Sequence, residues 1–348
     1  MNRIKKVIGI VLTAVLLCAT GCGKKEEAAD QNNLQVVFKY GDSTVTKGET
    51  YIYVRTIKER YERQYGEDVW QLSLPEDSED EVSIVELTKQ AVIDEIVRVK
   101  TLVAHAAELH VRLTEDEETE LKTRAREFYE GLTDTDIAAM ELTEDIVMTV
   151  MSDCMLAKKV EEKVLADDPV EISSEEARMT TFYDMYFPCY ETDAGGNITP
   201  YSAEKKAEQY ENALHACGTL ATANIDDDEK AGDIEKLAEY YGLKEGGEQT
   251  LTPQEISRIY GEKACNLLYS MKDGEYSAVV ETEYGYHIFQ MIALTDEKAT
   301  EGRKEAMTND AVAEKMSSIM TGWRNEIDKD FVYPDSVDME VYDSITLD

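Results

Sequence analysis

The segment YSMKDGEYSAVVETEYGYHIFQM, residues 269–291, determines how we interpret the fold of this chain. Apolar and aromatic residues at 286–293 favour a β-strand, and residues 277–280 favour a second strand paired with it through the connection 281–285. His287, one of four histidines in the chain, lies near the start of the longer strand. A histidine at this position either takes part in chemistry or fills a place in the core.

The composition argues against nucleic acid as a partner. The 348 residues include 73 acidic and 36 basic side chains, which give a formal net charge of −37. Such a chain repels phosphate backbones over most of its surface. Its length is sufficient for two domains, each able to bury its own core.

The N-terminal residues have the pattern of a bacterial lipoprotein signal. Basic residues within 3–6 precede an apolar run, 7–17, that is short for a permanent membrane span. The sequence ATGC that follows, ending at Cys22, resembles a lipobox. This resemblance implies removal of a signal peptide, 1–21, acylation of Cys22, and anchoring in the lipid bilayer at the extracytoplasmic face of the cell membrane. An ordinary cleaved signal followed by an incidental cysteine is the alternative.

Residues 22–33 are polar and predict a flexible tether, and residues 34–178 predict a mainly helical domain. An apolar stripe of helical period runs through 85–106. In a capping box, Ser or Thr and a Glu three residues later satisfy each other's free backbone donors at the start of a helix. Such pairs begin at Thr46, Ser83, Thr114 and Ser173.

We predict no metal site and no cofactor. His105 and His110 lie beside the apolar stripe, but a separation of five residues does not place two ligands on one face of a helix. The cysteines that would remain in the mature chain after Cys22 are widely spaced and form no CxxC pair. Their spacing is compatible with one disulfide but does not identify it.

The texture of the sequence changes after Arg178. Residues 179–298 predict a smaller α/β domain with a strand at 179–190, helices at 202–216 and 233–241, and a further helix that starts at a Thr252 capping box and extends towards Met271. Residues 299–330 are helical again, and 331–347 are expected to be a β-like tail. The fold class is therefore α+β: segments 34–178 and 299–348 form one helical domain, into which 179–298 is inserted.

The order strand, helix, helix, helix, strand, strand in 179–298 resembles the parvulin type of peptidyl-prolyl isomerase. The resemblance is carried mainly by MKDGEYS at 271–277 and YGYHI at 284–288, and less strongly by IEKLAEYYGLKEGGE at 234–248 and ISSEEARM at 172–179. Together with the lipobox and the helical flanks, the mature chain resembles PrsA/SurA-type extracytoplasmic foldases, and the helical domain is expected to be chaperone-like.

Parvulins use two neighbouring histidines, a Cys or Asp near the reacting carbonyl, and a Met/Phe pocket for the proline ring. The resemblance places the second histidine on His287 and the family threonine on Thr282. The first histidine is replaced by Asp184, in the run DMYFP, and the Cys or Asp position falls near 242–243, which has no polar side chain. Pocket positions fall near Tyr260 and on Ala264, and Tyr186 in the DMYFP run is assigned to substrate binding with them.

This mixed set of residues leaves two roles open for His287. It is either retained for packing and one hydrogen bond, towards Asp184 or Thr282, or it is catalytic. If Asp184 and His287 are adjacent, the carboxylate favours the imidazolium form and makes the pair sensitive to pH.

Three functions follow from these observations. The first is a membrane-anchored folding factor with peptidyl-prolyl isomerase activity on exported polypeptides. The second is an inactive holdase-type chaperone that keeps the parvulin fold and cradles unfolded polypeptides in a cleft between its domains. The third, a solute-binding lipoprotein, fits less well because the chain lacks the repeated βα pattern of two doubly wound lobes.

Overall fold

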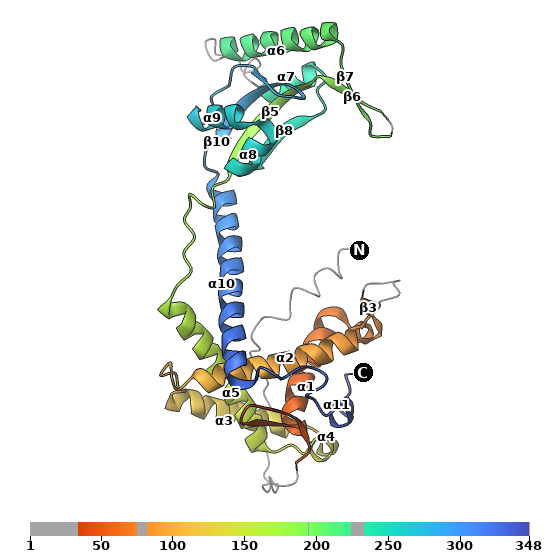
Figure 1. The fold of residues 1–348 in the computed structure, drawn as a ribbon, viewed down its shortest axis with the longest axis vertical. Coiled ribbons are helices and arrows are strands. Elements are labelled where there is room, and N and C mark those ends of the chain that lie inside the picture. The colour runs from red at the N-terminus through yellow and green to blue at the C-terminus, as the bar shows by residue number, and fades with distance from the viewer. Residues whose placement is uncertain (1–33, 75–81, 194, 224–232, 348) are drawn as a thin grey trace. The chain divides into compact units, whose positions relative to one another are not determined.

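The computed structural model describes residues 34–74, 82–193, 195–223 and 233–347. The predicted signal peptide, tether and Cys22 lie outside these ranges. The chain divides into two compact units, Met1–Pro169 with Val312–Asp348 and Val170–Ala311, which we call the helical unit and the sheet unit (Figure 1). The sequence placed the boundaries at 178/179 and 298/299. The second difference arises because one uninterrupted helix, α10 (Glu297–Asp328), contributes to both units.

The helical unit opens with an antiparallel pair of strands and continues as helices, in agreement with the predicted α+β class. Its elements are β1 (Val36–Tyr40), β2 (Ser43–Thr46), α1 (Lys47–Tyr65), η3 (Glu67–Gln71), β3 (Ser73–Leu74), β4 (Val82–Ser83), α2 (Ile84–His105), α3 (Glu115–Glu130), α4 (Asp134–Ala139), α5 (Glu144–Asp167), the C-terminal part of α10, and α11 (Met339–Asp343). The predicted apolar stripe is the buried face of α2, with Val92, Ile96 and Val99 at its centre.

The capping boxes predicted at Ser83, Thr114 and Thr252 are confirmed, with both reciprocal hydrogen bonds present. The box predicted at Thr46 is only half formed. Its hydroxyl accepts from the Glu49 amide, and the Glu49 carboxylate is turned mainly towards Lys100, with which it forms an ion pair. At Ser173 the local hydrogen bonds form, yet a single turn follows and not the predicted helix.

The buried Glu49 carboxylate belongs to an ion cluster that joins three helices through two half-buried side chains. The ammonium of Lys100 in α2 lies 2.7 Å from Glu49 Oε1 in α1 and 2.8 Å from Asp153 Oδ2 in α5. Burial lowers the pKa of Lys100, but the two carboxylates raise it by more, so that it lies above its ordinary value. A tertiary ion pair has thus overridden a local capping preference.

The β-like tail predicted at 331–347 is wrong in the main. Within the described residues, the tail makes one isolated bridge, between Phe38 and Val337, and then forms α11. Tyr342 of α11 is fully buried, and its hydroxyl donates to the Lys89 carbonyl at 2.8 Å. The burial of this aromatic ring favours a helix here, although the alternation of apolar and polar residues at 331–347 had favoured a strand.

The sheet unit contains one four-stranded antiparallel sheet in the order β8-β5-β10-β9. Its elements are β5 (Thr180–Pro188), β6 (Tyr190–Thr192), β7 (Ile198–Pro200), α6 (Ala203–Ala223), α7 (Ile234–Tyr240), β8 (Gly246–Leu251), α8 (Pro253–Tyr260), α9 (Glu262–Ser270), β9 (Val280–Glu281) and β10 (Gly285–Ala293). The helix predicted from Thr252 towards Met271 is broken at Gly261, whose φ of 86° no helical residue adopts.

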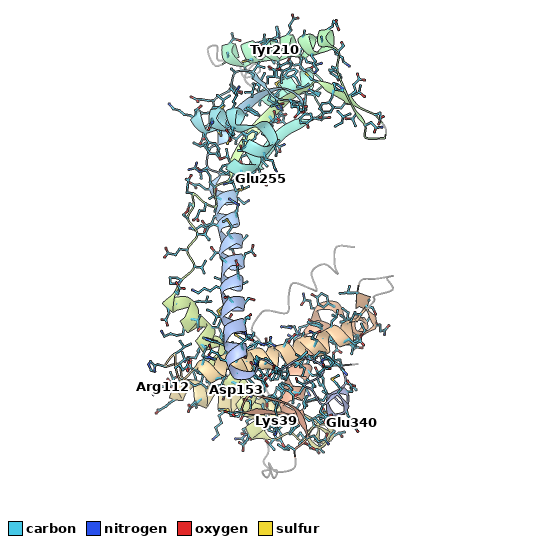
Figure 2. The ribbon with its side chains drawn as sticks, in the orientation of Figure 1. Lys39, Arg112, Asp153, Tyr210, Glu255 and Glu340 are labelled. Atoms are coloured by element: carbon cyan, nitrogen blue, oxygen red, sulfur yellow. The ribbon has the colours of Figure 1, made fainter. Side chains whose placement is uncertain are left out.

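Alternate residues of β5 and β10 face opposite sides of this sheet. Met185, Phe187 and Ile288 pack with α6 and α7, whereas Phe182, Phe289 and Met291 pack with α8 and α9. Figure 2 labels one residue on each side of the sheet, Tyr210 in α6 and Glu255 in α8. By the same alternation, Asp184 and His287 belong to the side covered by α8 and α9.

The described cysteines, Cys154, Cys189, Cys217 and Cys265, are free thiols. Cys154 is half-buried beside the Tyr53 hydroxyl, at 3.5 Å, and burial raises the pKa of its thiol to about 11. In the ranges that the structure describes, we find no helix with the length and apolar character needed to cross a bilayer.

Candidate functional site

Antiparallel pairing of β5 with β10 brings Asp184 and His287 together. In the register of these strands, Tyr186 lies opposite His287, and Asp184 lies opposite Phe289. His287 Nδ1 is 2.9 Å from Asp184 Oδ1, and His287 Nε2 is 3.0 Å from the hydroxyl of Thr282 in the turn before β10. The three residues assigned to catalysis from the sequence therefore converge at one point on the sheet.

The Thr282 hydroxyl can serve His287 in either protonation state. When Nε2 carries no proton, the hydroxyl donates to it. When Nε2 is protonated, the hydroxyl accepts from the ring and can donate to the Gly285 carbonyl, which is 3.3 Å away. In both arrangements Nδ1–H donates to Asp184, so the ring position does not depend on the second proton.

Tyr260, at the end of α8, occupies the second carboxylate oxygen of Asp184. Its hydroxyl donates to Asp184 Oδ2 at 3.2 Å. Burial raises the pKa of this hydroxyl, and the neighbouring carboxylate raises it further. Tyr260 is therefore a permanent donor at physiological pH, and both oxygens of Asp184 are satisfied.

Aromatic rings enclose the histidine. The Tyr186 ring stacks on His287 with a centroid distance of 4.5 Å and an interplanar angle of 10°, and Tyr260 meets it edge-on at 5.3 Å. The Phe289 ring is nearly parallel to it at 5.7 Å. The Tyr186 hydroxyl donates to the Tyr284 carbonyl at 2.9 Å, which fixes the stacked ring over the site.

Burial closes the site to solvent. Asp184 is 3% exposed and His287 is 5% exposed. Ala264, assigned to the proline pocket from the sequence, is 1% exposed inside the apolar cluster under α8 and α9. Leu243, near the expected Cys or Asp position, packs with the cluster on the opposite side of the sheet. In this conformation Asp184, His287 and Tyr260 form a buried network in which each polar group has a hydrogen-bond partner.

Two glycines that were not predicted as site residues shape this network. A Cβ on Gly246 would lie 2.3 Å from the Asp184 carbonyl oxygen, and its φ is +95°. A Cβ on Gly285 would lie 2.2 Å from the Phe187 carbonyl oxygen. Both positions accept only glycine because the neighbouring strand passes too close for a side chain. The Gly246-Gly247 pair was the available signal for the first of them.

The chain is similar in sequence to proteins named as foldases. No protein-family model matches the chain. The chain is 23% identical over 310 residues to the foldase protein PrsA of Clostridium acetobutylicum, which covers 85% of this chain and 86% of that protein. It is 24% identical over 300 residues to the foldase protein PrsA of Caldanaerobacter subterraneus, with 84% of each covered.

Solved structures of similar proteins are also PrsA. A crystal structure of peptidylprolyl isomerase (PrsA) from Bacillus cereus covers 89% of this chain and 99% of its own, with 13% identity and a TM-score of 0.27. That of PrsA from Bacillus subtilis covers 79% and 98%, with 13% identity and a TM-score of 0.21. In sequence, the chain resembles PrsA foldases along most of its length.

Proposed function

We propose that this PrsA-like chain is an extracytoplasmic protein-folding factor that binds unfolded exported polypeptides and is held on the cell membrane by acylated Cys22. In this proposal the sheet unit is a parvulin-like scaffold for peptide binding. The Asp184–His287 network stabilises that scaffold and does not catalyse isomerisation. Support for a folding role comes from the relatives named foldase, which match 84–86% of the chain.

One observation supports a structural role for His287: its two ring nitrogens and both carboxylate oxygens of Asp184 have hydrogen-bond partners, and both residues are buried. Spontaneous rotation about an X-Pro bond takes tens to hundreds of seconds, because it disrupts amide resonance. A catalyst must admit the proline ring and bind the twisted amide more tightly than either planar form. Here Asp184 and His287 are almost fully buried, and Ala264 contributes to the core. This arrangement favours a holdase over an isomerase.

Isomerase activity remains the second candidate, since one observation favours it. Asp184, Thr282 and His287 meet at hydrogen-bonding distance, as expected of a site that keeps part of a parvulin's machinery. Opening of the aromatic cover over His287 would be required before a substrate could reach it. The two candidates therefore predict different results in a direct assay.

The test consists of two assays on the same protein, one of X-Pro isomerisation and one of aggregation suppression. We expect the full chain to give no acceleration of X-Pro isomerisation in tetrapeptides above the spontaneous rate, while it suppresses aggregation of a chemically unfolded client. His287→Gln should leave suppression unchanged, as should the control Tyr240→Phe at a tyrosine that is 80% exposed. Acceleration by the wild type that disappears in His287→Gln, with circular dichroism unchanged, would instead establish the isomerase.

The membrane anchor has a separate test. Expressed with its signal, the chain should fractionate with membranes and carry a mass increase from acyl chains at Cys22. Cys22→Ala should release it from the membrane fraction, because a single covalent lipid modification is the proposed means of attachment. A Cys22→Ala chain that stays with the membrane would contradict this part of the proposal.

A further inference from the structure

The connection between β5 and α6 is not a simple loop. β6 and β7 pair as a separate antiparallel hairpin that extends away from the other strands of the sheet unit (Figure 1). Isolated two-stranded hairpins are marginal in water. This one is held at its base, where the Cys189 amide donates to the Tyr284 carbonyl and the Tyr201 amide donates to the Cys189 carbonyl, both at 2.8 Å.

The turn of the hairpin is fixed by one carboxylate. Asp193 Oδ1 accepts from the Gly195 amide at 2.8 Å and the Asn197 amide at 2.9 Å, and its Oδ2 accepts from Asn197 Nδ2 at 2.9 Å. These hydrogen bonds hold the pKa of Asp193 below its ordinary value. These hydrogen bonds join Asp193 at the end of β6 to Gly195 and Asn197 before β7.

The two faces of the hairpin differ in chemistry. Tyr190 lies opposite Pro200, and Thr192 lies opposite Ile198, so these four side chains share one face by the alternation of strands. Glu191 and Thr199 lie on the other face, where the Glu191 carboxylate binds the ammonium of Lys205. The hairpin therefore has an apolar face and a polar face.

The apolar face is uncovered in the structure. Ile198 is 57% exposed, and Thr192 and Pro200 are also exposed. The face continues into Tyr284, which is 51% exposed and meets the Tyr190 ring edge-on at 6.2 Å. We call Tyr190, Thr192, Ile198, Pro200 and Tyr284 the apolar strip. Contiguous exposed apolar side chains of this kind mark interaction sites.

The rim of the apolar strip is acidic. Glu245 accepts from the Tyr190 hydroxyl at 2.8 Å, and Glu281 and Glu283 flank the turn that carries Tyr284. Among the described residues, no lysine or arginine forms an ion pair with these three glutamates. One lysine, Lys244, directly precedes Glu245 in the sequence, so the three glutamates outnumber the adjacent cation, in a chain whose net charge is −37.

We propose that the apolar strip binds an extended segment of a client polypeptide in which apolar or aromatic residues are flanked by lysine or arginine. Apolar side chains would pack on Ile198 and Pro200, and a cation would lie between the Tyr284 ring and the rim carboxylates. The charge of the rim selects cationic segments over anionic ones. This inference names a client class and therefore rests on the proposed folding function.

The test uses three labelled peptides with the same apolar residues, flanked by lysines, by glutamates or by serines, and measures binding to the full chain by fluorescence anisotropy. We expect the lysine peptide to bind about tenfold more tightly than the glutamate peptide, and its affinity to fall as salt rises from about 0.05 to 0.3 M. Ile198→Asp and Tyr284→Ala should each weaken it by about tenfold, as expected of central contacts. The control Tyr240→Ala should leave it unchanged.

Three results would overturn the inference: unchanged binding in both strip variants, equal binding of the lysine and glutamate peptides, or equal loss in the Tyr240→Ala control. A mass that rises with protein concentration, and that Ile198→Asp abolishes, would also overturn it by making a second copy of the chain the occupant. Suppression of client aggregation, measured on the same variants, separates the two proposals. If the wild type suppresses aggregation while the strip variants bind peptide normally, the folding function stands and the strip does not.

Discussion

Replacement of Asp184 tests whether the network under α8 and α9 is structural. In Asp184→Leu, the Nδ1–H of His287 and the hydroxyl of Tyr260 lose their acceptor, at present 2.9 Å and 3.2 Å away. Both donors would stay enclosed, because position 184 is 3% exposed. In Asp184→Asn, the side-chain carbonyl still accepts from His287, and the amide can donate to the Tyr260 oxygen.

The expected magnitudes follow from these contacts. An unsatisfied buried donor costs about 1–3 kcal/mol, so that two of them cost about 2–6 kcal/mol, and the apolar area gained by leucine recovers part of this loss. We therefore expect Asp184→Leu to lower the free energy of unfolding by about 1–4 kcal/mol. Asp184→Asn exchanges charge-assisted for neutral hydrogen bonds and should lower it by about 1–2 kcal/mol.

Urea denaturation followed by circular dichroism measures both variants. Glu248→Gln, at an exposed position of β8 beside the same strand, is the matched control and should lie within about 0.5 kcal/mol of the wild type. The structural interpretation would be refuted if Asp184→Leu were as stable as the wild type, because a leucine accepted without loss means that His287 and Tyr260 do not depend on this carboxylate.

Three further predictions concern local features. Gly246→Ala should destabilise the sheet unit more than Gly247→Ala, and thermal unfolding of the two variants compares them. Both glycines have positive φ, but a Cβ at 246 would lie 2.3 Å from a carbonyl oxygen, whereas one at 247 would meet nothing within 4 Å. Lys100→Met leaves the buried Glu49 carboxylate and the half-buried Asp153 carboxylate without their cation and should lower the free energy of unfolding by about 3 kcal/mol. Because the folded-state pKa of Lys100 is raised, its contribution is complete below the unfolded pKa of about 10.4 and is lost as pH rises through the folded pKa. Denaturation at pH 9 and at pH 11 should therefore show a loss of stability in the wild type that the variant lacks; equal losses would contradict the assignment. Thr252→Ala removes the N-cap of α8 and should cost about 1 kcal/mol in the same assay, and no change would mean that Pro253 alone sets the start of this helix.

The parts of the fold that could be predicted from sequence are those that local chemistry decides. The aromatic runs of β5 and β10 and the capping boxes at Ser83, Thr114 and Thr252 all lie where the sequence placed them. The strand β8 was not predicted, because Gly-Gly-Glu-Gln has little preference for a strand and pairs only through its neighbour β5.

Distant partners decided the remainder. Glu49 appeared to belong to a capping box, but a lysine some fifty residues away in sequence binds its carboxylate. The resemblance to parvulins suggested that Asp184, Thr282 and His287 lie together. In the structure, the pairing register of β5 and β10 places Asp184 beside His287. Neither the closed aromatic cover nor the apolar strip could be predicted, since both depend on which rings meet across strands that are far apart in sequence.

The half-buried thiol beside Tyr53 has a consequence for handling in air. Thiol oxidation and disulfide exchange proceed through the thiolate, and a thiol whose pKa is about 11 has roughly one molecule in ten thousand ionised at neutral pH. Cys154 is thus chemically quiet, and we expect its thiol to stay reduced in air without an added reductant.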